Sequence, residues 1–152
     1  MAVYKKRNFK VDWILNNELA VGPALMNNQE LTKLKNIDIK SILSLCGENE
    51  APNLENIEKE FIFKRVVLPD HKCKTQLTFD QLNFALSALE ELKSFGPVYV
   101  HCVAAKERSP LICMAWLVKN HNLTPMQALS YVMEAHQGTN PLPEQLKILE
   151  LL

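Results

Sequence analysis

The stretch between residues 97 and 121 joins a short apolar segment to a long one, and it limits the folds open to this chain. The segment "PVYVH" predicts a buried strand. The segment "SPLICMAWLVKNH" is apolar nearly all round, so it predicts a helix at the centre of the molecule. Pro110 fits that helix only if it lies in the first turn. A buried strand that leads into a buried helix is typical of an α/β sheet.

The rest of the chain continues this alternation of strands and helices. Apolar segments bounded by turn residues predict strands at residues 13–15, 18–22, 39–46 and 61–69. Helical periodicity and capping residues predict helices at residues 27–36, 53–60, 77–96, 124–136 and 142–152. Gly96 is expected at the C′ position of the third of these helices. The order predicts an α/β fold with a central, mostly parallel sheet and helices on both faces, which binds ligands beyond the carboxyl ends of its strands.

Composition and charge narrow the classes of protein further. A chain of 152 residues suits a single domain, here 1–152, with residues 1–10 as a basic tail. Lys+Arg and Asp+Glu both number 17, which argues against a general nucleic-acid coat. No apolar stretch approaches the roughly 20 residues needed to span a bilayer. The basic cluster in "MAVYKKRNFK" has no apolar segment after it, so we do not expect it to act as a secretory signal. The four cysteines have no metal-ligand spacing, so we expect no metal or other cofactor, reduced thiols and a cytoplasmic location.

The loop "HCVAAKERSP" between the predicted strand and helix has the residues for binding an oxyanion. Backbone N–H groups of a tight loop that enters a helix can converge on one point, where the helix adds partial positive charge. Cys102 at the base of the loop would be favoured as a thiolate by the same field. Arg108 can bind two phosphate oxygens at once, and Ser109 can hydrogen-bond the sulfur. We expect His101 to hold the loop backbone rather than to transfer protons.

A nucleophile under a bound phosphate also needs an acid that protonates the leaving oxygen. The segment "LPDHK" supplies Asp70 at the end of another predicted strand, from which a loop could cover the site. Taken alone, Asp70 is better explained as a turn residue after Pro69 than as this acid.

The loop resembles the H-C-x5-R-[ST] phosphate loop of cysteine-dependent protein tyrosine phosphatases, and in particular their dual-specificity branch. In that branch the general-acid aspartate lies about thirty residues before the cysteine, and here 102 − 70 = 32. Further similarity runs from "LAVGPALMNNQELTKLKNIDIKSILSL" to "TNPLPEQL", and so covers nearly the whole chain. The resemblance implies a dual-specificity phosphatase-like fold and identifies Asp70 as the acid.

The resemblance also implies a two-step reaction. Cys102 attacks phosphorus while Asp70 protonates the leaving oxygen, and Asp70 then activates the water that releases phosphate. The loop would bind the phosphate together with Arg108. Its residues are Val103, Ala104, Ala105, Lys106 and Glu107. The implied substrates are phosphoproteins, carrying phosphotyrosine and also phosphoserine or phosphothreonine, or other phosphomonoesters such as phosphoinositides.

Two loop residues depart from what such a site usually contains. The family usually has glycine at the position of Ala105. A positive φ there would cost alanine roughly 1–2 kcal/mol, whereas a negative φ would cost little. Glu107 is a carboxylate beside an anion site, so we expect it to point away from the phosphate and to pair with a nearby base. Lys106, with Lys72 and Lys74, would favour substrates with extra phosphates if the three surround the pocket; otherwise they are solvated lysines.

Cys46 ends a predicted strand where the lipid-phosphatase branch of this superfamily has a cysteine that can form a disulfide with the nucleophile. Cys46 is therefore a candidate redox partner of Cys102, and a structural buried thiol is the alternative. Two other functions stay open. The first is an inactive phosphate-binding module that captures phosphorylated partners; the second is a rhodanese-like sulfur transferase, which would need neither Asp70 nor Ser109.

Overall fold

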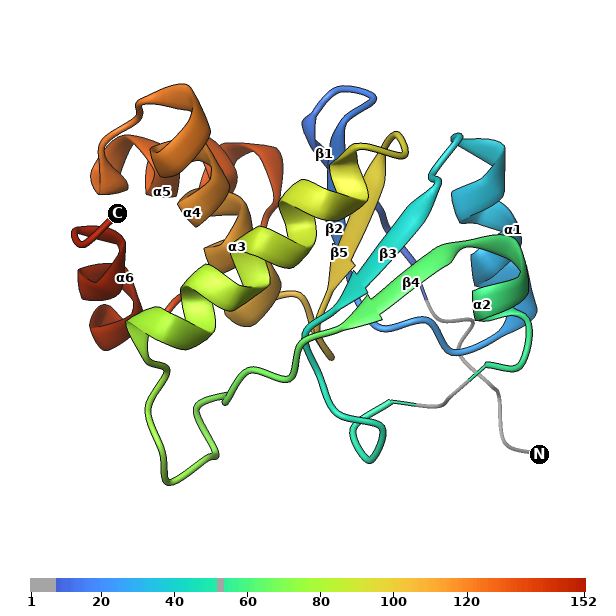
Figure 1. Cartoon of the computed structure of the whole chain (residues 1–152), viewed down its shortest axis with the longest axis horizontal. Coiled ribbons are helices and arrows are strands. Elements are labelled where there is room, and N and C mark those ends of the chain that lie inside the picture. The colour runs from blue at the N-terminus through green and yellow to red at the C-terminus, as the bar shows by residue number, and fades with distance from the viewer. Residues whose placement is uncertain (1–7, 52–53) are drawn as a thin grey trace.

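The computed structural model describes residues 8–51 and 54–152, and within them the chain forms a single α/β domain around one sheet (Figure 1). The strands follow the spatial order β1-β2-β5-β3-β4. Only β1 is antiparallel to its neighbour, while the β2–β5, β5–β3 and β3–β4 pairs are parallel. The bounds are β1 (Asp12–Leu15), β2 (Leu19–Gly22), β3 (Ser41–Ser44), β4 (Ile62–Arg65) and β5 (Val98–His101). The predicted mostly parallel sheet is thus confirmed. Residues 1–7 of the predicted basic tail lie outside the described residues.

Helices cover both faces of the sheet, as predicted. Their bounds are α1 (Asn28–Asn36), α2 (Ile57–Glu60), α3 (Phe79–Lys93), α4 (Arg108–His121), α5 (Pro125–Ala135) and α6 (Pro143–Leu149). Alternate strand residues point to opposite faces. In β5, Val98 and Val100 pack in the core formed by helices α3 to α6, whereas Tyr99 packs in the core formed with α1 and α2.

The helix starts follow the capping residues of the sequence. Asn27 accepts a hydrogen bond from the backbone N–H of Glu30, and Thr78 and Thr124 each form a complete capping box. Gly96 does not occupy the predicted C′ position. Helix α3 ends at Lys93 with Ser94 as its cap, so the left-handed conformation of Gly96 lies two residues beyond the cap.

The strand predicted over residues 61–69 is longer than the observed β4. The ladder with β3 ends at Arg65, but the backbone N–H groups of Val66 and Leu68 still donate to the carbonyl oxygens of Ser44 and Leu45. This extended segment therefore carries the chain along β3 to the carboxyl edge of the sheet.

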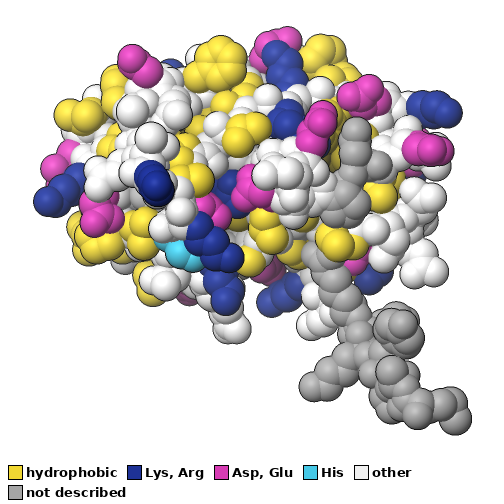
Figure 2. Space-filling view, turned by 90° about the horizontal axis from the view of Figure 1, so that it is seen from below, with side chains coloured by type: hydrophobic (Ala, Val, Ile, Leu, Met, Phe, Trp, Pro, Cys, Tyr) yellow, Lys and Arg dark blue, Asp and Glu magenta, His cyan; other side chains and the backbone are white. Residues whose placement is uncertain are grey.

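The carboxyl ends of the parallel strands meet at one edge of the sheet, the lower edge in Figure 1. Figure 2 looks onto the molecule from that side, where lysine or arginine, acidic and histidine side chains are interspersed among apolar ones. Within the described residues, no helix is both long and apolar enough to cross a bilayer.

Candidate active site

Cys102 lies at this edge, where β5 ends and a six-residue loop leads into α4. Its side chain is buried, and its Sγ lies 3.3 Å from the Oγ of Ser109, within the first turn of α4. Pro110 also lies in that first turn, where a proline ring is tolerated. The sulfur therefore faces the positive end of a buried helix with one hydroxyl in contact.

The carbonyl oxygens of the loop are held outward by three separate segments. The Val103 oxygen accepts from the backbone N–H of Ala24 at 3.1 Å, and the Lys106 oxygen accepts from the backbone N–H of Asn140 at 2.6 Å. The Ala105 oxygen lies 2.6 Å from Nε2 of His136. By contrast, the backbone N–H groups of residues 103–107 have no acceptor within residues 8–51 and 54–152. The three tied oxygens share peptide units with the N–H groups of Ala104, Lys106 and Glu107, which therefore point to the opposite side, so this loop can bind an oxyanion.

His136 and Asp12 support this loop, although no sequence motif marks either residue. His136 Nδ1 lies 2.7 Å from Asp12 Oδ2, while Nε2 contacts the Ala105 oxygen. Through these two contacts the ring links β1 to the middle of the loop. The two residues are 124 positions apart, and no local pattern connects them.

Ala105 adopts the left-handed backbone conformation, with φ +58°, and its side chain is buried. This is the position at which the sequence departs from the usual glycine. The alternative of a negative φ is therefore wrong, and the loop includes a strained residue that its surroundings hold in place.

Arg108 is fixed by Glu50, a carboxylate that no sequence motif connects to it. Glu50 accepts from both ends of the guanidinium, with Oε1 2.9 Å from Nη2 and Oε2 3.2 Å from Nη1. Nη1 also donates to the carbonyl oxygens of Leu45 and Leu68 at 3.4 and 3.1 Å. Burial raises the pKa of Glu50, but the hydrogen bonds from Arg108 and from the Gly47 amide outweigh burial and leave it below its usual value. Glu50 is thus a carboxylate that orients the arginine.

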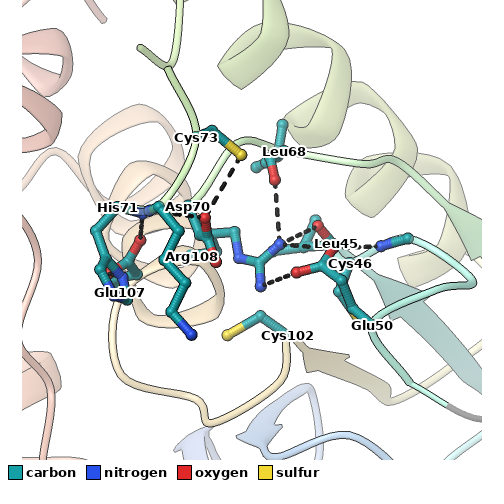
Figure 3. A network of polar contacts seen from close by, with 12 residues as sticks. Leu45, Cys46, Glu50, Leu68, Asp70, His71, Cys73, Cys102, Glu107 and Arg108 are labelled. Atoms are coloured by element: carbon teal, nitrogen blue, oxygen red, sulfur yellow. Dashed lines mark hydrogen bonds and ion pairs between the residues drawn. The ribbon is translucent and has the colours of Figure 1, made fainter. Parts of the chain in front are cut away.

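One edge of the guanidinium stays unused. Arg108 Nε is buried and has no hydrogen-bond partner among the described residues, and only one of the two Nη2 hydrogens is taken by Glu50. These two donors lie along the same edge of the planar group, the arrangement that binds two oxygens of a phosphate. Figure 3 shows Cys102 on the Nη2 side of the guanidinium, away from Leu68.

His101 and Cys46 lie beneath the loop. His101 Nδ1 is 3.0 Å from the carbonyl oxygen of Cys102 and 4.0 Å from the Sγ of Cys46. Burial lowers the pKa of His101 to about 4, so the ring is neutral and its Nδ1–H donates to the loop backbone. Burial also raises the pKa of Cys46 above its ordinary value. Both Cys46 and Cys102 are free thiols here, and the redox pairing stays a prediction.

Asp70 lies in the segment that follows β4 and faces the same cavity as Cys102. Its Oδ1 accepts from the Lys72 amide at 2.9 Å and from the Cys73 thiol at 3.4 Å. Burial raises the pKa of Asp70, but these hydrogen bonds and the charge of Arg108 lower it overall. The free site therefore has Asp70 as a carboxylate at neutral pH.

Glu107 turns away from the loop centre and pairs with His71, as Figure 3 shows. The cavity above the loop has a volume of about 620 Å³. Lys72 and Lys106 line it, whereas Lys74 lines an adjoining cavity instead, so only two of the three expected lysines surround this pocket.

Comparison with known proteins identifies the class. The model of the dual specificity phosphatase catalytic domain matches residues 24–151, and the chain belongs to that family, within the cysteine-based protein tyrosine phosphatase superfamily. It is therefore a cysteine-dependent phosphatase.

Its relatives are distant in sequence. "Phosphatidylglycerophosphatase and protein-tyrosine phosphatase 1" of Rattus norvegicus is 24% identical over 147 residues, which cover 91% of this chain and 75% of the relative. "Dual specificity protein phosphatase 1" of Arabidopsis thaliana is 28% identical over 110 residues, covering 71% and 52%. Among solved structures, PTPMT1 in complex with PI(5)P superimposes with a TM-score of 0.80 at 19% identity, covering 93% of this chain and 92% of the other. Tk-PTP in its active form gives a TM-score of 0.79 at 23% identity, covering 93% and 95%.

Replacing Ala105 with glycine tests the strain in the loop. The Ala105→Gly variant should gain about 1 kcal/mol in free energy of unfolding, because glycine adopts a positive φ without a steric penalty. It should hydrolyse an aryl phosphate at least as fast as the wild type. Urea unfolding and steady-state kinetics measure both. Ala104→Gly is the matched control, since Ala104 has no positive φ and its replacement should not stabilise. A large loss of rate in Ala105→Gly would show instead that the alanine is adapted to this loop.

Replacing Glu50 with glutamine tests the orientation of Arg108. The Glu50→Gln variant keeps the side-chain size but presents an amide N–H₂ to the guanidinium. The paired hydrogen bonds from Arg108 to two carboxylate oxygens are therefore lost. We expect kcat/KM for an aryl phosphate to fall by about 10- to 100-fold, as hydrogen bonds to charged groups are worth roughly 1.5–3 kcal/mol. Glu48→Gln removes an exposed carboxylate from the same loop and should change little. Equal kinetics in the two variants would mean that Glu50 does not orient the arginine.

Proposed function

We propose that this chain hydrolyses phosphomonoesters through a cysteinyl-phosphate intermediate, with Asp70 as general acid and then general base. The observation that carries the proposal is the set of unpaired donors around the sulfur. The amide groups of residues 103–107 and one edge of Arg108 have no acceptor among the described residues, and all of them belong to the loop and helix start that follow Cys102. A buried donor without a partner, such as Arg108 Nε, is costly unless a ligand satisfies it, and a tetrahedral oxyanion can accept from this donor and from the loop amides at once.

In the first step the sulfur of Cys102 attacks phosphorus in line with the leaving oxygen. The S–P bond forms as the P–O bond breaks, and Asp70 gives its proton to the leaving alkoxide or phenoxide. Asp70 must be protonated for this step. The negative charge of a bound phosphate raises the pKa of a nearby carboxyl, so substrate binding itself favours the acid form. Arg108 and the loop amides stabilise the charge on the other phosphate oxygens.

In the second step water attacks the phosphocysteine. Asp70, now a carboxylate, takes a proton from the water, the S–P bond breaks, and inorganic phosphate leaves. The Ser109 hydroxyl, 3.3 Å from the sulfur, donates to the departing thiolate and makes it a better leaving group. The lowered pKa of Asp70 in the free site suits this base role.

Hydrolysis of a simple aryl phosphate by three proteins tests the proposal. Cys102→Ser should lose about 10³-fold or more in kcat, because the hydroxyl is a far weaker nucleophile than the thiolate. Asp70→Asn should lose about 10²-fold or more at pH 6, because the amide cannot transfer the proton. Equal rates in all three proteins would contradict the enzymatic function. No turnover in any of them, with phosphate bound tightly, would favour the inactive phosphate-binding module.

We infer that the substrates carry a second anionic group near the scissile phosphate. The cavity is open and wide, and Lys72 and Lys106 line it with two cationic side chains that the proposed chemistry does not use. The solved complex of PTPMT1 with PI(5)P is consistent with such a substrate, as are the phosphatidylglycerophosphatase relatives. A phosphoinositide or a peptide with neighbouring phosphorylated residues has this chemistry.

Neutral variants of the two lysines test the inferred preference. The double variant Lys72→Gln/Lys106→Gln should lose about 10-fold in kcat/KM on a multiply phosphorylated inositol lipid or peptide. It should change little on phenyl phosphate, which has no second anion. Lys74→Gln, which lies outside the main cavity, is the control. An equal loss on both kinds of substrate would show that the lysines act on the reacting phosphate itself.

A further inference from the structure

Glu107 is the last loop residue before Arg108 and occupies the N-cap position of α4, but its side chain does not cap that helix. The carboxylate instead reaches the segment that carries Asp70. Its Oε1 accepts from the backbone N–H of His71 at 2.8 Å, and its Oε2 lies 2.9 Å from His71 Nδ1 (Figure 3). The side chain is only 13% exposed, whereas that of His71 is 55% exposed. A carboxylate is thus held beside an anion-binding loop, where its negative charge opposes phosphate binding. Its presence there calls for a separate role.

The two contacts are the hydrogen bonds that connect residues 69–77 to the rest of the described chain. The other hydrogen bonds of this segment are local, from the amides of Lys72 and Cys73 and the thiol of Cys73 to Asp70. Upstream, Leu68 is fixed by its bond to Leu45 and by Arg108, and downstream Thr78 begins the capping box of α3. The nine residues between these anchors contact the phosphate loop through Glu107.

The residue that Glu107 holds is the one directly after Asp70. Fixing the His71 N–H fixes the peptide unit that Asp70 shares with His71, and with it the distance from the Asp70 carboxyl to the cavity over Cys102. General acid catalysis requires the acid within hydrogen-bond reach of the leaving oxygen, and a displacement of about 1 Å can cost about 10²-fold in rate.

We propose that Glu107 is a positioning residue that holds the general-acid segment over the phosphate loop through His71. The proposal rests on the function proposed above. Glu107 lines the cavity, but in this role it transfers no proton, because its oxygens are bonded to His71; it joins the element that binds the phosphate to the element that protonates the leaving group. The contact between Glu107 and His71 thereby fixes the position of the acid relative to the nucleophile.

The leaving group distinguishes this role from general support of the loop. A dinitrophenolate leaves with little help from an acid, whereas an unactivated phenolate requires it. The Glu107→Ala variant should therefore lose about 10- to 100-fold in kcat on phenyl phosphate and only a few-fold on 2,4-dinitrophenyl phosphate. Glu107→Gln can still accept from the His71 N–H and donate to a neutral ring, so it should recover most of the rate on phenyl phosphate. Glu144→Ala removes a carboxylate that lines the adjoining cavity and controls for the change in charge.

A double-mutant cycle with Asp70 tests whether Glu107 acts through the acid. In the Asp70→Asn background, Glu107→Ala should cause no further loss on phenyl phosphate, because no acid remains to be positioned. Inhibition by inorganic phosphate should change by less than a few-fold, since the phosphate loop itself is intact. The same loss on both leaving groups, or the same loss with and without Asp70, would overturn the proposal.

Hydrogen exchange separates a failure of this proposal from a failure of the proposed function. Turnover of 2,4-dinitrophenyl phosphate by the wild type tests the function alone. Whatever that rate is, the amide of His71 should exchange about 10-fold or more faster in Glu107→Ala than in the wild type or in Glu144→Ala. Equal exchange in the three proteins would show that Glu107 does not hold the segment, even if the enzyme is active.

Discussion

The rest of the site depends on the contacts that hold the carbonyl oxygens of the phosphate loop on its outer side. Three segments from distant parts of the chain each supply one donor, namely Ala24 after β2, His136 after α5 and Asn140 before α6. With these oxygens tied on the outside, the N–H groups of the same peptide units, those of Ala104, Lys106 and Glu107, are left for a ligand. The strained φ of Ala105 persists because its carbonyl is held by a buried histidine. The free protein thus already holds the loop in the conformation that binds an anion.

The catalytic side chains are held by a second set of contacts that all lead back to this loop. Glu50 fixes the outer edge of Arg108 and leaves the inner edge free, and Glu107 reaches from the loop to the segment of Asp70. Two carboxylates therefore lie next to a site for phosphate, and each is hydrogen-bonded to a protein partner. Their arrangement reconciles acidic residues with anion binding, because neither carboxylate oxygen pair is directed at the sulfur.

Local signals explain how much could be predicted from the sequence. Capping residues such as Thr78 and Thr124 act within one helical turn, so the starts of α3 and α5 were predicted correctly. The end of α3 was wrong because a glycine after a helix can lie at more than one position beyond the cap. Glu50, Asp12 and His136 were missed because each acts on a partner at least 31 positions away. Glu107 was expected to pair with a nearby basic residue, but only the three-dimensional arrangement identifies that residue as His71.

The central claim is that the Cys102 sulfur becomes covalently phosphorylated during turnover, and rapid quenching tests it most directly. An aryl phosphate labelled with ³²P is mixed with enzyme and stopped in alkaline detergent, which preserves phosphocysteine. The account predicts label on the wild-type chain, located at Cys102 by peptide mapping, and none on Cys102→Ser. Rapid hydrolysis without label on Cys102, or label and turnover that persist in Cys102→Ser, would contradict it.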